Sequence, residues 1–143
     1  MSKVKIVYWT GTGNTQKMAD AIAEGAKSAG ADVEVVTFDD VTADSLAGDD
    51  VVALGCPAMG AENLEETVVE PFVTEFEGKC SGKKLGLFGS YGWGDGQWMR
   101  DWVDRMSAAG ATIVTGEGLI ANNDPDDSAI SEAQNFGKAL ANA

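Results

Sequence analysis

Short runs of consecutive apolar residues alternate along this chain with segments in which apolar residues recur every three or four positions. Runs such as VVALG at residues 51–55 and KLGLFG at residues 84–89 contain almost no polar side chain. Such runs are typical of parallel strands that are buried on both faces of a sheet. The expected strands are Lys3–Trp9, Asp32–Phe38, Asp50–Gly55, Lys83–Ser90 and Ala111–Ala121.

The segments between these strands have the spacing of amphipathic helices. Asn63 followed by Glu66 predicts a capping box at the start of one helix, which Pro71 is expected to break or kink. Apolar helical faces are expected at Thr15–Ala26, Trp98–Met106 and Ile130–Leu140. Alternating strands and helices predict an α/β fold, a doubly wound parallel sheet of about five strands in three layers.

Length and composition limit the class of protein. The chain has 143 residues, of which 44% are hydrophobic, so we expect one domain over residues 1–143. No apolar run approaches the roughly 20 residues that span a bilayer, and the N-terminus lacks the pattern of a signal peptide. We therefore expect a soluble, cytoplasmic protein. Two cysteines and no histidine do not suit a disulfide framework or a zinc site, and we expect no metal.

The net charge of −13, from 10 basic and 23 acidic residues, disfavours binding to nucleic acid or to anionic membranes. It favours partners with basic surfaces, which an acidic protein attracts from a distance. A contribution to solubility alone explains the same charge equally well.

The loop at residues 10–15, TGTGNT, follows the first expected strand and contains neither lysine nor arginine. Ligands of doubly wound sheets bind beyond the carboxyl ends of the strands, which is where this loop lies. Its backbone amides and the following helix N-terminus suit a phosphate. A P-loop would need Gly-Lys-Ser/Thr, and Gln16 replaces the third glycine of the dinucleotide fingerprint. An ordinary strand-to-helix connection remains the alternative.

Three further loops are expected at the same edge. In CPAMGAE, residues 56–62, the Met59 thioether suits the face of a flat ring, and Glu62 suits a ring N–H, although an ordinary turn explains this segment better when it is taken alone. In GSYGWGDGQW, residues 89–98, glycines flank Trp93 and favour its stacking on a planar ligand. In ANNDPDD, residues 121–127, the asparagines reach a ligand edge or simply form a turn and a helix cap. Together the loops predict a phosphate at one end and a planar ring between Met59 and Trp93, as in flavin mononucleotide (FMN).

The segments YWTGTGNT, GCPAMGAENLEE and LFGSYGWGDGQWMRD resemble, in order and spacing, the short-chain flavodoxins of anaerobic, clostridial-like bacteria. The resemblance covers essentially the whole chain, and the uninterrupted fifth strand matches the short-chain group. It implies a flavodoxin-like sheet of five strands in the order 2-1-3-4-5. It also implies a low-potential one-electron carrier with non-covalent FMN, which shuttles mainly between semiquinone and hydroquinone.

The resemblance assigns roles to individual residues. Met59 and Trp93 flank the flavin ring, and Glu62 accepts a hydrogen bond from its N3–H. The phosphate is held by Thr10, Gly11, Thr12, Gly13, Asn14 and Thr15. Contacts along the phosphate, the ribityl chain and the ring edge are expected from Ser90, Tyr91 and Asn123. The remaining cofactor-binding positions are Pro57, Ala58, Gly60, Ala61, Gly92, Gly94 and Asp95.

A phosphate loop without a cation suits a strong reductant, because the fully reduced flavin is an anion that a nearby lysine would stabilise. The carboxylates expected to add to this negative field are Glu62, Glu65, Glu66, Asp95, Asp124 and Asp126. We expect a monomeric electron carrier rather than an enzyme, with redox partners that present basic docking surfaces. The alternative is a flavodoxin-like, NAD(P)H-dependent FMN or quinone reductase, although no segment suggests a nicotinamide site.

Overall fold

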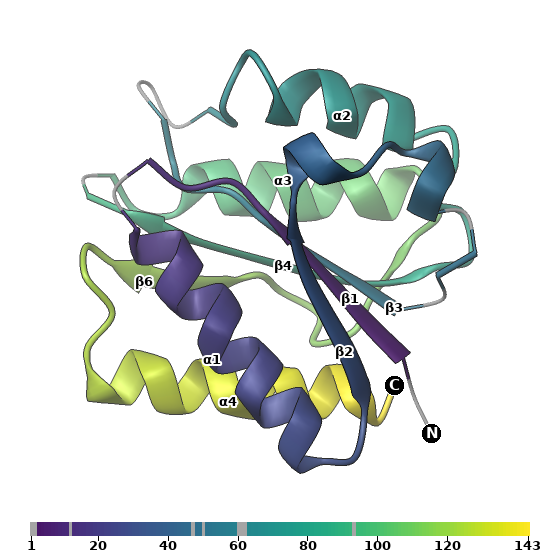
Figure 1. The fold of residues 1–143 in the computed structure, drawn as a ribbon. Helices are drawn as coiled ribbons and strands as arrows, with labels where there is room; N and C mark the ends of the chain where they lie inside the picture. Colours follow the sequence, from purple (N-terminus) through teal and green to yellow (C-terminus); the bar gives the residue numbers. More distant parts are fainter. Residues whose placement is uncertain (1–2, 12, 47, 50, 60–62, 93) are drawn as a thin grey trace.

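A computed structural model of the chain describes residues 3–143 except residues 12, 47, 50, 60–62 and 93 (Figure 1). The strands are β1 (Lys3–Tyr8), β2 (Asp32–Thr37), β3 (Val51–Gly55), β4 (Lys84–Tyr91), β5 (Thr112–Ile113) and β6 (Leu119–Asn122). The α-helices are α1 (Asn14–Ser28), α2 (Val69–Phe76), α3 (Gln97–Ala108) and α4 (Asp127–Ala141). Among these helices, none is long and apolar enough to cross a membrane.

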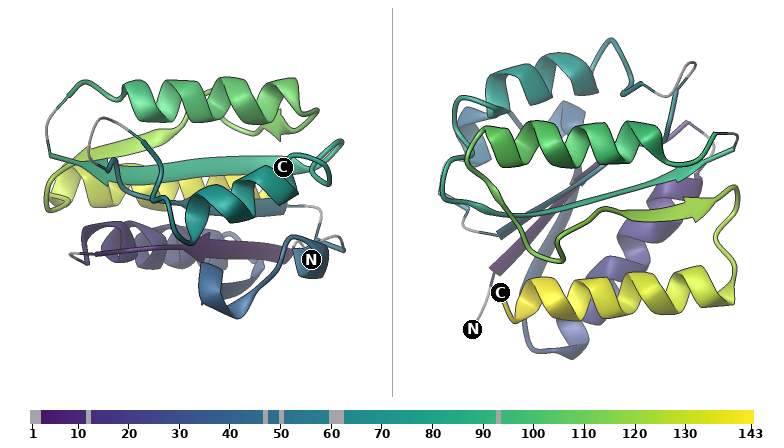
Figure 2. Two further views of the ribbon diagram at one scale, coloured as in Figure 1. Left: turned by 90° about the horizontal axis from the view of Figure 1, so that it is seen from above. Right: turned by 180° about the vertical axis from the view of Figure 1, so that it is seen from behind.

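All the strand pairs of the sheet are parallel, and the strand order is β2-β1-β3-β4-β5, with β6 also beside β4. Helices α1 and α4 cover one face of the sheet, and α2 and α3 cover the other (Figures 1 and 2). The predicted three-layer, doubly wound sheet in the order 2-1-3-4-5 is therefore confirmed. The order reverses between β1 and β3, which lie side by side, and this is where doubly wound proteins place their ligands.

The side chains of β3 show why an apolar run becomes a central strand. Val52 and Leu54 belong to the core cluster under α2 and α3, whereas Val51 and Ala53 belong to the cluster under α1 and α4. Successive side chains of a strand point to opposite faces, so a strand covered by helices on both sides needs apolar residues at every position.

The fifth strand differs from the expectation of one continuous strand over Ala111–Ala121. It consists of two pieces, β5 and β6, which both pair with β4 but are separated by a turn at residues 114–118. Within this turn Gly116 has φ 80°, a left-handed conformation that cannot continue a strand. The Thr115 hydroxyl donates to the Glu117 carbonyl at 2.6 Å, which closes the turn.

The second helix begins later than the expected capping box at Asn63 and Glu66. Helix α2 starts at Val69, and the carboxylate that accepts hydrogen bonds from its first backbone N–H groups is Glu65. Pro71 does not break the helix as predicted. It lies in the first turn of α2, where a backbone N–H has no helical partner to lose.

Candidate functional site

The loop after β1 folds back on itself before α1 begins. Gly13 precedes the helix with φ 94°, and its N–H donates to the Thr10 hydroxyl oxygen at 2.9 Å. The first turn of α1 carries no acidic side chain, so nothing there offsets the positive end of the helix dipole. The backbone of the predicted phosphate loop therefore suits an anion. Thr12, which is also predicted to hold the phosphate, lies outside the described residues.

Two buried hydroxyls join this loop to the end of β4. Thr15 Oγ1 and Ser90 Oγ lie 3.2 Å apart, and the Ser90 N–H donates to Thr15 Oγ1 at 3.4 Å. The relative exposures of the two residues are 1% and 5%. The structure thus brings together two predicted site residues that are 75 positions apart in the sequence.

The turn after β3 is closed by a pair of backbone hydrogen bonds. The N–H of Met59 donates to the Asn63 carbonyl, and the N–H of Asn63 donates to the Met59 carbonyl, both at 2.9 Å. The N–H of Ala58 donates to the Ser90 carbonyl at 2.9 Å, which ties the turn to the end of β4. The predicted site residues Gly60, Ala61 and Glu62 fall between these anchors and lie outside the described residues.

The turn can approach β4 closely because residue 89 is glycine. A Cβ atom on Gly89 would lie 2.1 Å from the carbonyl oxygen of Cys56 and 3.2 Å from the ring of Trp98. The indole N–H of Trp98 donates to the same Cys56 carbonyl at 3.2 Å. Trp98 therefore lies in the core, as its helical spacing predicts, and holds the end of β3 in place.

The loops after β4 and β6 are also joined. Asn123 has φ 55°, and its N–H donates to the Tyr91 carbonyl at 2.7 Å. The side-chain amide of Asn122 lies 3.4 Å from the Tyr91 carbonyl and 3.5 Å from that of Gly92. A non-glycine residue in the left-handed region is uncommon and points to a site where the surroundings hold the backbone. Trp93, the predicted stacking residue, lies outside the described residues.

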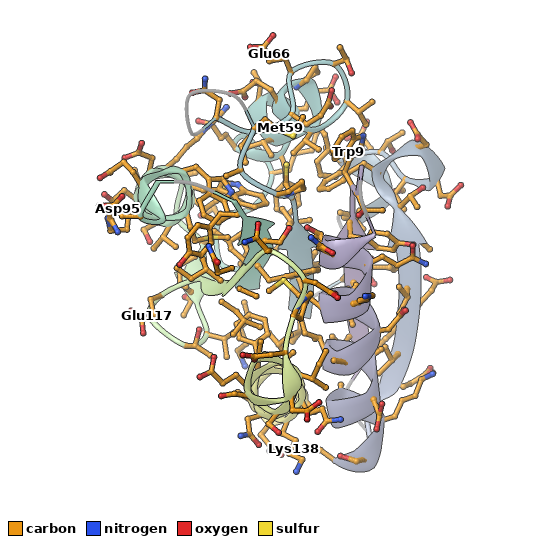
Figure 3. All side chains as sticks on the ribbon, turned by 90° about the vertical axis from the view of Figure 1, so that its left-hand side faces the viewer. Trp9, Met59, Glu66, Asp95, Glu117 and Lys138 are labelled. Carbon is orange, nitrogen blue, oxygen red and sulfur yellow. The ribbon has the colours of Figure 1, made fainter. Side chains whose placement is uncertain are left out.

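These loops surround a cleft of about 270 Å³ at the carboxyl edge of the sheet. Figure 3 looks onto this edge, with Trp9 and Met59 beside one another and Glu66 and Asp95 at the periphery. The cleft is lined by Trp9, Gly11, Asn14, Pro57, Ala58, Met59, Ser90, Tyr91, Gly92 and Asn123. All of these except Trp9 are among the predicted cofactor-binding residues.

Trp9 is the cleft residue that the sequence analysis missed. Its ring lies 3.4 Å from the position that a Cβ on Gly11 would take, so it packs directly against the phosphate loop. Its place at the carboxyl end of a buried strand, directly before that loop, was the available signal. Conversely, Asp95 was predicted to contact the cofactor but does not line the cleft. It pairs with Arg100 at 3.0 Å on the outer side of α3.

Several carboxylates that were expected to add to the negative field around the cleft take part in hydrogen bonds or ion pairs. Glu65 is only 7% exposed and accepts hydrogen bonds from residues 67–69. Asp124 pairs with Lys17 at 2.5 Å, and the Asp126 carboxylate caps α4 by accepting from the Ala129 N–H at 2.8 Å. Helix caps and ion pairs limit how much of this charge reaches the cleft.

Burial and hydrogen bonding set the ionisation of two groups behind the cleft. Burial raises the pKa of the Glu65 carboxyl, but the hydrogen bonds from Thr67, Val68 and Val69 outweigh burial and bring the pKa to about 2. Burial raises the pKa of the Cys56 thiol to about 12. Glu65 is therefore ionised and Cys56 is neutral at physiological pH, and Cys56 has none of the thiolate character of a redox thiol.

The strand order and the cleft beyond β1, β3 and β4 define a doubly wound α/β protein that places its ligand at the switch point of the sheet. The sequence profile of the family described as Flavodoxin matches residues 6–136. The flavodoxin of Megasphaera elsdenii is 52% identical over 140 residues, which are 98% of this chain and 99% of that protein. The flavodoxin of Clostridium beijerinckii is 52% identical over 139 residues, covering 97% and 99% of the two chains.

The same relationship holds in three dimensions. The solution structure of two-electron reduced Megasphaera elsdenii flavodoxin superposes with a TM-score of 0.89 over 98% of this chain and 99% of that one. This chain belongs to the flavodoxin family. Flavodoxins are electron carriers rather than enzymes, and they use FMN, for which the switch point between β1 and β3 is the known site. The predictions of the family, the FMN cofactor and electron transport are thus confirmed.

Proposed function

We propose that this chain is a low-potential one-electron carrier that works mainly on the second of the two one-electron couples of non-covalently bound FMN. The observation that carries the proposal is that none of the described residues of the cleft is a cation; they are glycines and uncharged polar, apolar and aromatic residues. Lys17, one turn inside α1, has its ammonium 2.5 Å from the Asp124 carboxylate. A phosphate at the start of α1 would therefore keep most of its negative charge.

The residues present fit FMN. The cleft offers backbone amides at a helix start, buried hydroxyls and the thioether of Met59, and these suit a phosphate, a polyol and a flat ring. We assign the phosphate to residues 10–15 and the two faces of the ring to Met59 and Trp93. Glu62 would accept from the ring N3–H. The edge of the cofactor would contact residues 57–61, 90–92, 94, 95 and 123, with Asp95 at the periphery.

When bound, FMN supplies the capacity to take up and release electrons one at a time. Among the described residues that line the cleft, none carries a positive charge. At about 10 Å and an effective dielectric constant of 20–80, one unit charge contributes roughly 0.4–1.7 kcal/mol. For a one-electron couple about 1.4 kcal/mol corresponds to about 59 mV. The charge of the phosphate itself is therefore enough to make the second couple more reducing, and carboxylates that no cation or helix cap engages add to it.

The partners follow from the same charge. With a net charge of −13, the protein attracts redox proteins whose docking surfaces are basic. Exposed carboxylates near the cleft, such as Glu66, belong to the surface that such partners would meet (Figure 3). We further propose that the chain acts as one domain and as a monomer. A cytoplasmic location stays a prediction.

The test is stepwise anaerobic reduction of the purified protein by dithionite, followed by visible absorption and by potentiometry. We expect a yellow protein that passes through a blue intermediate stage to a pale form, with two separated midpoint potentials. Direct two-electron bleaching would refute the one-electron carrier. A separate addition of NAD(P)H tests the reductase alternative, which predicts rapid reduction of the flavin without another protein.

A further inference from the structure

Asn63 and Leu64, which follow the cleft residue Met59 in the chain, lead into a buried carboxylate, that of Glu65. Glu65 is 7% exposed, and each of its carboxylate oxygens accepts two hydrogen bonds. One oxygen accepts from the Thr67 N–H at 2.9 Å and from the Thr67 hydroxyl at 2.5 Å. The other accepts from the N–H groups of Val68 at 2.6 Å and Val69 at 3.2 Å. The carboxylate therefore fixes the chain to the start of α2.

The backbone of Glu65 makes two further contacts. Its N–H donates to the Cys56 sulfur at 3.4 Å, and its carbonyl accepts from the Glu70 N–H at 2.9 Å. Cys56 is fully buried and follows β3 directly. Glu65 thus connects the end of β3 to the first turn of α2. Between these two points the chain passes the cleft residues Pro57, Ala58 and Met59.

Within these anchors the paired backbone hydrogen bonds between Met59 and Asn63 close the turn. The Leu64 side chain, next to Glu65, is 8% exposed and belongs to the core under α2 and α3. Leu64 and Asn63 directly precede Glu65, so the chain that leads into the Glu65 anchor also carries one half of the Met59–Asn63 pair. Glu65 itself does not line the cleft.

We propose that Glu65 is a positioning residue for electron transfer: its carboxylate holds the chain at Asn63 and Leu64 so that the backbone pair between Met59 and Asn63 stays closed. The proposal rests on the proposed function, because it concerns the turn assigned to the flavin. It also changes the role of Glu65 from a surface charge, as the sequence suggested, to a buried anchor.

The chemistry of the site explains why a carboxylate is needed. All four groups that point at the Glu65 oxygens are donors in this structure. A glutamine has one acceptor oxygen and one donor NH₂ group, so either orientation places a donor against two donors. Glu65→Gln therefore keeps the shape of the side chain but loses about half of the hydrogen bonds.

The experiment compares three variants by amide hydrogen exchange in NMR, with and without FMN. Glu65→Gln loses the charge and about half of the hydrogen bonds of the anchor. Thr67→Val loses the hydroxyl donor but keeps the charge, and the exposed neighbour Glu66 provides Glu66→Gln, which loses a charge but keeps the anchor. The amides of Met59 and Asn63 report on the turn, and the amide of Val7 in β1 serves as the internal reference.

We expect exchange at Met59 and Asn63 to become roughly tenfold faster in Glu65→Gln, since lost hydrogen bonds to a charged group are worth more than a kilocalorie per mole. Thr67→Val should also accelerate exchange at Met59 and Asn63, but by less, and Glu66→Gln should leave the exchange rate unchanged. In the FMN-loaded protein, the midpoint potential of the first one-electron couple should shift more in Glu65→Gln and Thr67→Val than in Glu66→Gln.

Unchanged exchange in Glu65→Gln, or equal acceleration in Glu66→Gln, would overturn the proposal. If Glu65→Gln does not fold, Thr67→Val against Glu66→Gln decides the question alone. Because the exchange measurement on the FMN-free protein needs no redox activity, its result is independent of the proposed function. A failure of the potentiometric test with altered exchange would therefore count against the redox role and not against the anchor.

Discussion

The ammonium of Lys17 and the carboxylate of Asp124 lie 2.5 Å apart, although the residues are 107 positions apart in the sequence. The pair joins the first turns of α1 to the loop between β6 and α4, beside the cleft residues Asn14 and Asn123. Both side chains are more than half exposed. The pair is therefore worth little for stability, but it fixes the position of the Lys17 ammonium, one turn into the helix that follows the phosphate loop.

Asp124→Asn should raise the potential of the second couple, because it removes a negative charge and releases Lys17. Lys17→Gln should lower the same potential, because it removes the cation. Each shift is expected to be roughly 20–70 mV at low ionic strength and smaller at high salt. Potentiometry at two salt concentrations measures both shifts, with Asp127→Asn, at the first residue of α4, as a control for a nearby charge. Shifts of the same sign in the Asp124 and Lys17 variants would contradict this account.

The stability of the protein should depend on pH through Glu65. Its pKa lies at about 2 in the folded protein, below the ordinary value of 4.5. A lowered pKa stabilises the fold above pH 4.5, and this contribution is lost as the pH falls toward 2. Urea unfolding should show the FMN-free protein to be more stable than Glu65→Gln by up to about 3 kcal/mol at pH 7. The difference should shrink between pH 5 and pH 2, and a constant difference would speak against an ionised buried anchor.

Gly89→Ala should destabilise the protein and weaken FMN binding together. The added Cβ would lie 2.1 Å from the backbone oxygen of Cys56, so the ends of β3 and β4 must separate. We expect a loss of about 2–4 kcal/mol in the free energy of unfolding, in the range of overpacked cores or above it. Gly48→Ala is the matched control, because a Cβ there meets nothing within 4 Å. Equal stability of the two variants in thermal unfolding would refute the close approach.

Trp9 should contribute to cofactor affinity. Its half-buried ring lines the cleft and packs against Gly11 of the phosphate loop. Trp9→Ala should weaken FMN binding by roughly tenfold or more, and Trp9→Phe by much less, because an aromatic wall is kept. Titration of the FMN-free protein with FMN, followed by quenching of flavin fluorescence, measures both. An unchanged affinity in Trp9→Ala would remove Trp9 from the site.

The main features of the fold could be predicted because they depend on local patterns. The continuous apolar run of β3 and the helical spacing of Trp98, Trp102 and Met106 indicate which faces are buried, and these faces are buried in the structure. Most predicted residues of the cleft follow from the rule that loops at the carboxyl ends of parallel strands meet. The motifs at residues 8–15, 55–66 and 87–101 indicate the family, and the family implies the cofactor.

The break in the fifth strand was a local feature that the sequence analysis overlooked. The TGEG sequence at residues 115–118 contains a turn signal, but the apolar residues on either side favoured one strand. The late start of α2 has a similar origin. The helix cap was predicted at Asn63 and Glu66, whereas in the structure the adjacent, buried Glu65 accepts from the first N–H groups of α2.

The sequence by itself determined the alternation of strands and helices, the buried faces and the chemistry available in each loop, because these depend on residues close in the chain. Only the tertiary structure decided which distant groups meet. Thr15 touches Ser90, Lys17 pairs with Asp124, and Trp98 holds the carbonyl of Cys56. Such contacts depend on strand register, helix packing and the close approach that glycine permits. Sequence spacing contains no measure of any of these distances.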